Sequence, residues 1–200
     1  MLKRVFDFTA SLMGLIILSP LFIVISILIK LDSPGPIMYR GVRAGKNFKP
    51  FRIFKFRSMI IDSEKEGLGT PDNDPRVTKI GKWLRYYKLD ELPQLLNVLK
   101  GEMSLVGPRP EVMEYAELYK GKPEEMVYSI KPGITDYASL WNVNEGEILK
   151  GAKTADKIEK KYFKQIRPEK IRLQVKYVRE KSFWTDIKII FLTIKKLIKK

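Results

Sequence analysis

The stretch Lys88-Leu89-Asp90-Glu91-Leu92-Pro93-Gln94 places two adjacent carboxylates in a chain of 200 residues whose formal net charge is +15. Asp90 is suited to cap a helix N-terminus, and Pro93 is tolerated in a first helical turn. Gly101 is suited to end this helix. The helix would have an apolar face of leucines at helical spacing: Leu92, Leu95, Leu96 and Leu99. The sequence therefore predicts Asp90 and Glu91 at a helix N-terminus, where free backbone N–H groups favour anions.

The residue types that the chain lacks narrow its chemistry. There is no histidine and no cysteine, which excludes the usual proton shuttle at neutral pH, thiolate catalysis and disulfides. Catalysis falls to carboxylates, Lys, Arg, Tyr or a hydroxyl, and any metal would be a hard, oxygen-liganded cation such as Mg²⁺. The 38 basic residues against 23 acidic ones suit a nucleic acid, an anionic membrane or a phosphorylated substrate.

An uncharged run from Phe8 to Ile29 is long enough for a helix to cross a hydrocarbon core of about 30 Å. A signal peptide has a shorter run and a small-residue cleavage site, so it fits poorly. A buried helix of a soluble domain is the other alternative. Ser19-Pro20 interrupts the run, and an interior proline bends a helix. The Ser19 hydroxyl can take up part of the freed backbone capacity.

Positive charge flanks the apolar run on both sides. The basic residues concerned are Lys3, Arg4, Lys30, Arg40, Arg43, Lys46, Lys49 and Arg52. Positive charge marks the cytoplasmic side, so a straight span would put one basic end on the wrong side. The sequence favours a re-entrant helix-break-helix that enters and leaves through one leaflet. Residues 1–31 are predicted to form this membrane hairpin, and residues 32–200 a cytosolic domain.

The cytosolic domain is predicted to be mainly α-helical with a small β component. Helices are predicted over residues 76–87, 111–119, 155–180 and 183–198. Strands are predicted over residues 37–40, over 48–59 and after the Lys131-Pro132-Gly133-Ile134-Thr135 turn. Residues 62–74 are predicted to be a loop or a short helix.

The predicted helix over residues 183–198 is basic and amphipathic. Its apolar face consists of Phe183, Ile187, Ile190, Phe191, Ile194 and Ile198. Such a helix can lie in a membrane interface, but packing on the domain core fits the pattern equally well. Both interpretations stay open.

Basic side chains accompany the carboxylate pair along the sequence. A carboxylate can attack phosphorus, and its neighbour can help to bind Mg²⁺; either Asp90 or Glu91 could be the nucleophile. Arg85 precedes the pair. Arg109, between two prolines, could hold a phosphate in bidentate fashion with little entropy to lose. Lys55 and Arg57, in an aromatic and basic segment, could meet phosphates or simply form a solvated strand face.

At these residues the chain resembles the bacterial sugar transferases, the monotopic polyprenyl-phosphate phosphoglycosyl transferases. The similarity runs nearly end to end. Its blocks are Phe6-Asp7, Ser19-Pro20, Ser33-Pro34-Gly35-Pro36, Phe54-Lys55-Phe56-Arg57-Ser58-Met59, Arg85, Leu89-Asp90-Glu91-Leu92-Pro93-Gln94, Asn97 to Ser104, Val106-Gly107-Pro108-Arg109-Pro110 and Lys131-Pro132-Gly133-Ile134-Thr135.

The resemblance implies a re-entrant membrane helix, a catalytic domain on the cytoplasmic face of the bacterial inner membrane, and Mg²⁺ dependence. It implies that Asp90 attacks the β-phosphorus of a UDP-sugar, releases UMP, and passes the phosphosugar to polyprenyl phosphate as the first membrane step of glycoconjugate assembly. Asp90 and Glu91 would hold Mg²⁺, or Glu91 would manage a proton. Arg85 and Arg109 would contact phosphates, with Lys55 and Arg57 as weaker candidates. Inner-membrane phospholipid and a homodimer are further expected partners.

The sequence departs from the family pattern in two places. After Thr135 many members continue Gly-Trp-Ala-Gln-Val, where this chain has Asp136-Tyr137-Ala138-Ser139-Leu140. Gln174 replaces an acidic residue. Both departures are expected to bear on which sugar is accepted. Without further transmembrane helices, the chain is expected to be the minimal catalytic form.

Two other functions compete with the transferase. A nucleic-acid-binding module would suit the net charge, but the long uncharged run argues against it, so no nucleic-acid partner is expected. A non-catalytic membrane scaffold is the second alternative. The intact Asp90-Glu91 pair argues against the scaffold.

Overall fold

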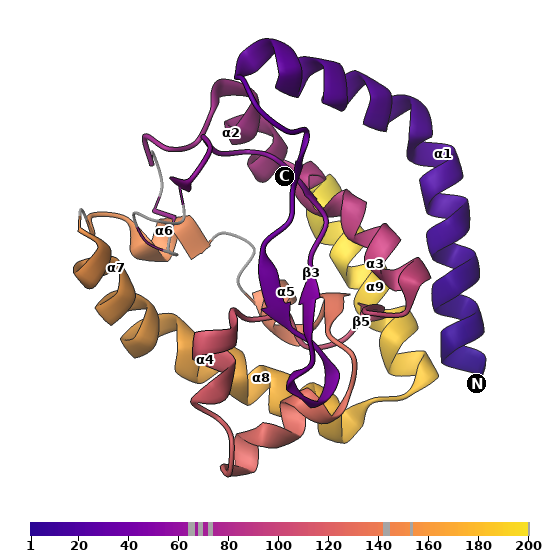
Figure 1. Ribbon diagram of the computed structural model, residues 1–200. Coiled ribbons are helices and arrows are strands. Elements are labelled where there is room, and N and C mark those ends of the chain that lie inside the picture. The colour runs from indigo at the N-terminus through magenta and orange to yellow at the C-terminus, as the bar shows by residue number, and fades with distance from the viewer. Residues whose placement is uncertain (64–66, 68–69, 72–73, 142–144, 153, 200) are drawn as a thin grey trace.

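The computed structural model describes residues 1–63, 67, 70–71, 74–141, 145–152 and 154–199 (Figure 1). Most of these residues are helical, which confirms the predicted mainly-α fold. The α-helices are α1 (Leu2–Asp32), α2 (Lys79–Tyr86), α3 (Leu95–Lys100), α4 (Met113–Glu117), α5 (Tyr137–Trp141), α6 (Glu145–Leu149), α7 (Ala155–Lys161), α8 (Arg167–Glu180) and α9 (Phe183–Ile198). Tighter or wider turns form η1 (Lys46–Phe48), η3 (Leu89–Gln94), η4 (Pro123–Ser129) and η5 (Tyr162–Ile166).

The strands are short and pair in twos within the described residues. They are β1 (Met38–Tyr39), β2 (Val42–Ala44), β3 (Pro50–Arg52), β4 (Lys55–Phe56), β5 (Ser104–Val106) and β6 (Gly133–Thr135). β1 pairs with β4 and β2 with β3, both antiparallel, while β5 and β6 are parallel. The parallel pair brings Gly107 against Gly133, where a Cβ on Gly133 would lie 2.0 Å from the Gly107 nitrogen. Only glycine permits this approach.

Helix α1 is continuous from Leu2 to Asp32 and bent (Figure 1), so the predicted bend is confirmed and the predicted break into two helices is wrong. Figure 1 shows α1 rising from the N-terminus along one side of the molecule and bending over the top. Pro20 lies inside the helix and cannot donate to the carbonyl of Ile16. The Ser19 hydroxyl donates to that carbonyl at 2.8 Å. The prediction that Ser19 takes up the freed backbone capacity is therefore confirmed.

Both halves of α1 pack on the rest of the molecule. Near its start, the carboxylate of Asp7 accepts a 2.8 Å hydrogen bond from the Ser104 hydroxyl. At its end, Asp32 accepts a 3.0 Å hydrogen bond from the Ile80 N–H. One buried cluster joins its second half to β4 and α2: Ile25, Ile29, Phe56 and Leu84.

By length and composition, α1 could also cross a membrane. Only 11% of its most apolar 18-residue window is buried. The helix therefore combines a wide exposed apolar surface with polar and apolar contacts to the rest of the chain.

Three predicted elements differ from the structure. The strand predicted over residues 48–59 is two short strands, β3 and β4, which pair with different partners. The strand predicted after the Lys131–Thr135 turn is wrong, because the observed strand β6 lies within that predicted turn and α5 follows it, where Asp136 accepts hydrogen bonds from the Ser139 N–H and hydroxyl. The helix predicted over residues 111–119 is limited to α4. Of residues 62–74, those at 64–66, 68–69 and 72–73 lie outside the described residues.

Helix α9 has the predicted bounds, Phe183–Ile198. One face buries Asp186 and Ile189 against the β5 region. Another face exposes large apolar side chains: Trp184, Phe191, Ile194 and Ile198. The helix thus packs on the core and presents an apolar surface at the same time, so the two interpretations of its sequence are compatible.

Candidate active site

The carboxylate pair lies in η3, a tight turn that precedes α3. The predicted N-cap at Asp90 is wrong. Lys88 adopts a left-handed conformation (φ 59°) and begins η3, and α3 starts only at Leu95. Gly101 ends α3 with φ 80°, as predicted. Asn97 ties this unit to the strands, because its side chain accepts from the Phe54 N–H at 2.8 Å and donates to the Arg52 carbonyl at 2.9 Å.

Glu91 lies at the centre of an ion-pair cluster. Arg109 donates from Nη1 to Oε2 of Glu91 at 2.8 Å and from Nη2 to Oε1. Lys55 donates to the same Oε1 at 2.9 Å. Burial raises the pKa of Glu91, but the charges of Arg109 and Lys55 hold it well below its usual range. Glu91 is therefore an ionised group that holds two cations in place.

Asp90, in contrast, is buried, and one of its carboxylate oxygens lacks a hydrogen-bond donor from the described part of the chain. The side chain is almost inaccessible, and its Oδ1 has no hydrogen-bond partner among the described residues. Burial and the neighbouring charge of Glu91 raise the pKa of Asp90, against the opposing charges of Lys55, Arg85 and Lys88. A buried carboxylate oxygen without a donor is rare in structural roles and is suited to nucleophilic attack or metal binding.

The other predicted phosphate ligands divide into two groups. Arg85, on α2, is close enough to lower the pKa of Asp90, and its side chain makes no hydrogen bond or ion pair within the described part of the chain. Arg57 is buried and donates to the carbonyls of Pro34 and Ser33 at the end of α1, the latter at 2.7 Å. Its guanidinium group therefore caps α1, which does not support the predicted contact with phosphates.

The two departures from the family pattern meet at the main chain of Arg109. Asp136 accepts from the Arg109 N–H, and Gln174 donates to the Arg109 carbonyl, both at 3.3 Å. Asp136 and Gln174 are both fully buried. Sequence spacing could not predict this convergence, although the unusual polar residues at the two positions signalled a local difference.

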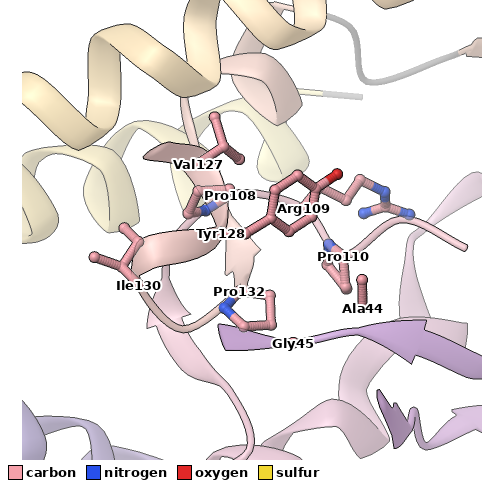
Figure 2. Close-up of a pocket in the computed structure, with 9 residues that line it drawn as sticks. All are labelled: Ala44, Gly45, Pro108, Arg109, Pro110, Val127, Tyr128, Ile130 and Pro132. Atoms are coloured by element: carbon pink, nitrogen blue, oxygen red, sulfur yellow. The ribbon is translucent and has the colours of Figure 1, made fainter. Parts of the chain in front are cut away.

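The turn that carries Arg109 is firmly packed. Figure 2 shows the residues around it, with the guanidinium group of Arg109 extending away from Val127 and Ile130. The cavity under the turn is about 10 Å³, about the room that one water molecule needs. It is too small for a ligand, so this packing serves to place the Arg109 side chain.

A much larger open cavity of about 1930 Å³ contains the carboxylates. Its polar lining includes Lys55, Arg85, Asp90, Glu91 and Arg109. Its apolar lining includes Leu18 of α1 and Ile190, Ile194 and Leu197 of α9. Pockets for small ligands usually measure about 300–1,000 Å³, so this cavity is larger than most of them. It could accommodate large compounds with both an anionic and an apolar part.

These features define a class of protein. A membrane-competent helix adjoins an open cavity where two carboxylates lie among cations, an arrangement suited to phosphorylated, lipid-borne compounds. The family follows from comparison with known proteins: the chain belongs to the bacterial sugar transferase family, whose model matches residues 1–200. The resemblance found from the sequence motifs is thereby confirmed.

Three relatives illustrate the similarity. The chain is 43% identical over 201 residues to undecaprenyl-phosphate glucose phosphotransferase of Komagataeibacter xylinus. It is 41% identical over 197 residues to UDP-glucose:undecaprenyl-phosphate glucose-1-phosphate transferase of Escherichia coli K12. These alignments cover 97% of this chain but only 35% and 39% of the two relatives. The exopolysaccharide production protein PSS of Rhizobium leguminosarum is 39% identical over 203 residues, covering 96% of this chain and 93% of that protein.

Proposed function

We propose that this protein transfers a sugar 1-phosphate from a UDP-sugar to a polyprenyl phosphate such as undecaprenyl phosphate. The observation that carries the proposal is the contrast between the two carboxylates. Glu91 is held by Arg109 and Lys55, whereas Asp90 Oδ1 is buried without a partner in the described residues. The names of the relatives, two of which specify undecaprenyl phosphate, support the acceptor.

The reaction has two steps at one phosphorus atom. An oxygen of Asp90 attacks the β-phosphorus of the UDP-sugar, the bond to the bridging oxygen breaks, and UMP leaves with the electron pair. An oxygen of the polyprenyl phosphate then attacks the phosphorus of the aspartyl phosphosugar. The Asp90 carboxylate leaves, and polyprenyl diphosphate-sugar forms. Arg85, Arg109 and Lys55 stabilise the phosphate oxygens in both steps.

The residues at the site fit a hard cation. Asp90 offers an orphaned carboxylate oxygen, and Glu91 is its neighbour. No cluster of three or more His, Cys, Asp or Glu side chains that could hold a metal occurs in the described part of the chain. Mg²⁺ often binds through one or two carboxylates and substrate phosphates, so Asp90 and Glu91 would hold it. Bound there, it would neutralise phosphate charge.

The membrane arrangement of the proposal is a re-entrant α1 with the catalytic domain on the cytoplasmic face. Asp7 and Asp32, on the two halves of α1, both bind the same body of the protein. A straight span would carry one half to the other side of the membrane. The exposed apolar face of α9 would lie in the same interface. A homodimer stays a prediction.

The test is UMP release by purified protein in detergent or lipid, with a panel of UDP-hexoses and UDP-N-acetylhexosamines, undecaprenyl phosphate and Mg²⁺. We expect release with one donor, dependence on the lipid phosphate for multiple turnover, and loss in the presence of a chelator. Asp90→Asn should lower the rate by about 10³-fold or more. Asp156→Asn, the same change at an exposed position of α7, should have no effect.

A covalent-trapping experiment separates the two carboxylates. With a donor labelled in its sugar and no acceptor lipid, the label should attach to the wild type and not to Asp90→Asn. If the Asp90→Asn protein is also labelled, the nucleophile is Glu91 and not Asp90. If folded protein in lipid releases no UMP and takes up no label with any donor, the non-catalytic scaffold is the favoured alternative.

A further inference from the structure

A second concentration of positive charge lies at the other end of α3 from the carboxylate pair. Gly101 ends this helix, and a Cβ built on it would lie 3.4 Å from Arg4 Nη2 and 3.5 Å from Lys131 Nζ. One cation comes from the first turn of α1 and the other from the loop before β6. Gly101, Arg4 and Lys131, here called the Gly101 notch, do not line the cavity that contains Asp90.

Neither cation of the notch forms an ion pair with a carboxylate of the described residues. Arg4 donates to the carbonyls of Val98 and Leu99, in the last turn of α3, at 2.6 and 2.9 Å. Lys131 makes no hydrogen bond or ion pair with any residue that the structure describes. Burial and the charge of Arg4 lower the pKa of Lys131. Two like charges held this close favour a bound anion between them.

One acidic group, Asp7, acts electrostatically on Lys131. Asp7 partly offsets the effect of Arg4 and Lys46 on Lys131. The Asp7 carboxylate, however, accepts hydrogen bonds from the Ser104 hydroxyl and the Leu105 N–H and is almost fully buried. Asp7 thus keeps its charge but forms no ion pair with Lys131, and the Lys131 amino group can bind an anion from outside the protein.

The surroundings of the notch identify the kind of anion. Arg4 lies over the Phe8 ring, 5.7 Å from its centroid. The first turns of α1 expose a row of apolar side chains: Leu2, Val5, Phe8, Leu12 and Met13. An anion in the notch would thus lie at the edge of a surface suited to hydrocarbon chains. An amphiphile with a phosphate head group matches both parts.

We propose that the Gly101 notch binds the phosphate group of an anionic membrane phospholipid. Arg4 and Lys131 supply the donors and the charge, and the bare Cα of Gly101 leaves room between them. The lipid is a resident one, because the notch is separate from the cavity of the proposed reaction. The proposal depends on membrane association and not on sugar transfer.

Chemical labelling of Lys131 tests the site without an activity assay. The full-length protein in neutral detergent is acylated with an amine reagent, and the rate at each lysine is read by peptide mass spectrometry. Phosphatidylglycerol at about ten times its dissociation constant should slow the labelling of Lys131 by about tenfold, as mass action requires. Exposed Lys122 should keep its rate. Phosphatidylcholine, whose head group has no net charge, should protect much less.

Two other compounds that carry a phosphate group, inorganic phosphate and undecaprenyl phosphate, serve as controls in the labelling experiment. If inorganic phosphate protects Lys131 as well as phosphatidylglycerol does, the notch is a free-phosphate site and the proposal is wrong. If undecaprenyl phosphate alone protects, the notch serves the acceptor substrate and the proposal is again overturned. Equal labelling of Lys131 with and without phosphatidylglycerol would show that no lipid binds there.

A pair of variants tests the geometry. Gly101→Asp introduces a carboxylate between the two cations, and Gly101→Asn introduces a neutral group of the same size; both residues tolerate the left-handed backbone. Phosphatidylglycerol should lose most of its protective effect in the Asp variant and less in the Asn variant. Lys131→Gln breaks no hydrogen bond or ion pair with the described residues. By native mass spectrometry it should retain fewer phosphatidylglycerol molecules than the wild type, and equal retention would contradict the site.

Discussion

Arg109 binds both carboxylate oxygens of Glu91, with 2.8 Å between its Nη1 and Oε2. The adjacent Asp90 carboxylate has no such partner at Oδ1 within the described residues. The two adjacent carboxylates of this tight turn thus differ in their surroundings, because Glu91 is paired with a guanidinium group and Asp90 Oδ1 has no donor in the part of the chain that the structure describes.

Replacing Arg109 with lysine should impair the site although the charge is kept. A lysine cannot form the paired hydrogen bonds that the planar guanidinium group makes with Glu91. Since the Arg109 side chain is 30% exposed, we expect a loss of only about 1–2 kcal/mol in the free energy of unfolding. UMP release should fall about tenfold or more. Denaturant unfolding and the UMP assay measure the two effects. Arg172→Lys, in an exposed pair with Glu169, is the matched control and should change neither.

Asp90→Asn should remove activity without destabilising the protein. Ionised Asp90 is buried with an unsatisfied oxygen, a state that costs free energy in the folded protein. The isosteric neutral amide removes that cost. The urea midpoint of the variant at neutral pH should therefore equal or exceed that of the wild type. A clearly lower midpoint would show that the Asp90 carboxylate contributes to folding and would weaken its assignment as a nucleophile.

Lys170→Met should reverse the pH dependence that Glu111 contributes to stability. Glu111 pairs with Lys170 and accepts a 3.0 Å hydrogen bond from Tyr162. Burial raises the pKa of Glu111, but these partners lower it overall below 4.5. The folded pKa is thus below the unfolded one. The pair stabilises the wild type above about pH 4.5, and this contribution is lost as pH falls through the folded pKa.

Without Lys170, burial still raises the pKa of Glu111, and only the Tyr162 hydrogen bond and the charge of Arg109 oppose it, so we expect a raised pKa. The variant should then lose stability as the pH rises above about 4.5, by about 3 kcal/mol at neutral pH. Urea unfolding between about pH 4 and pH 7 gives the two slopes. Lys176→Met, in an exposed pair with Glu180, should follow the wild-type slope. The same slope in Lys170→Met would contradict the assigned role of the pair.

Asp136→Ala should destabilise the turn that carries Arg109. Asp136 is fully buried and accepts from the Arg109 N–H and, at 2.7 and 2.8 Å, from the N–H and hydroxyl of Ser139. The loss of a capping side chain costs about 1–2 kcal/mol. We also expect a lower rate of UMP release, because Arg109 would be less firmly placed. Asp136→Asn keeps one acceptor oxygen and should lie between the alanine variant and the wild type in thermal unfolding.

Single cysteines can test the membrane arrangement of α1. The chain has no cysteine, so Leu2→Cys and Ser33→Cys each introduce a unique thiol at one end of the helix. If α1 is re-entrant, a membrane-impermeant reagent should label both positions from the cytoplasmic side only. Labelling of Leu2→Cys from the opposite side would establish a straight span. Met113→Cys, at the start of α4, marks the position of the catalytic domain.

The sequence predicted the features that local patterns determine. The apolar run and Pro20 predicted a long bent α1, and the spacing of apolar residues predicted the bounds of α9. Gly101 predicted the end of α3, because a left-handed residue there favours glycine. Each of these features depends on residues that are close together in the chain.

Other features of the site depend on residues far apart in sequence. The spacing around Asp90 indicated an α-helical N-cap, but the left-handed Lys88 produces a tight turn instead. Arg57 lies in a basic and aromatic segment that suggested a phosphate ligand. Its guanidinium group instead donates to the carbonyl of Ser33 at the end of α1, 24 residues earlier in the chain. The contact of Gln174 with the Arg109 carbonyl spans 65 residues. No local period encodes such contacts, which the tertiary structure alone creates.

The packing of α1 has a practical consequence for anyone who wishes to obtain a water-soluble enzyme by deleting the membrane segment. A truncated protein that starts after Asp32 would uncover Phe56 and Leu84, which now lie against Ile25 and Ile29. It would also remove Lys3 from the buried carboxylate of Asp186 and Arg4 from the end of α3. The membrane helix is thus part of the folding unit, and such a truncation should yield aggregated material rather than a smaller working enzyme.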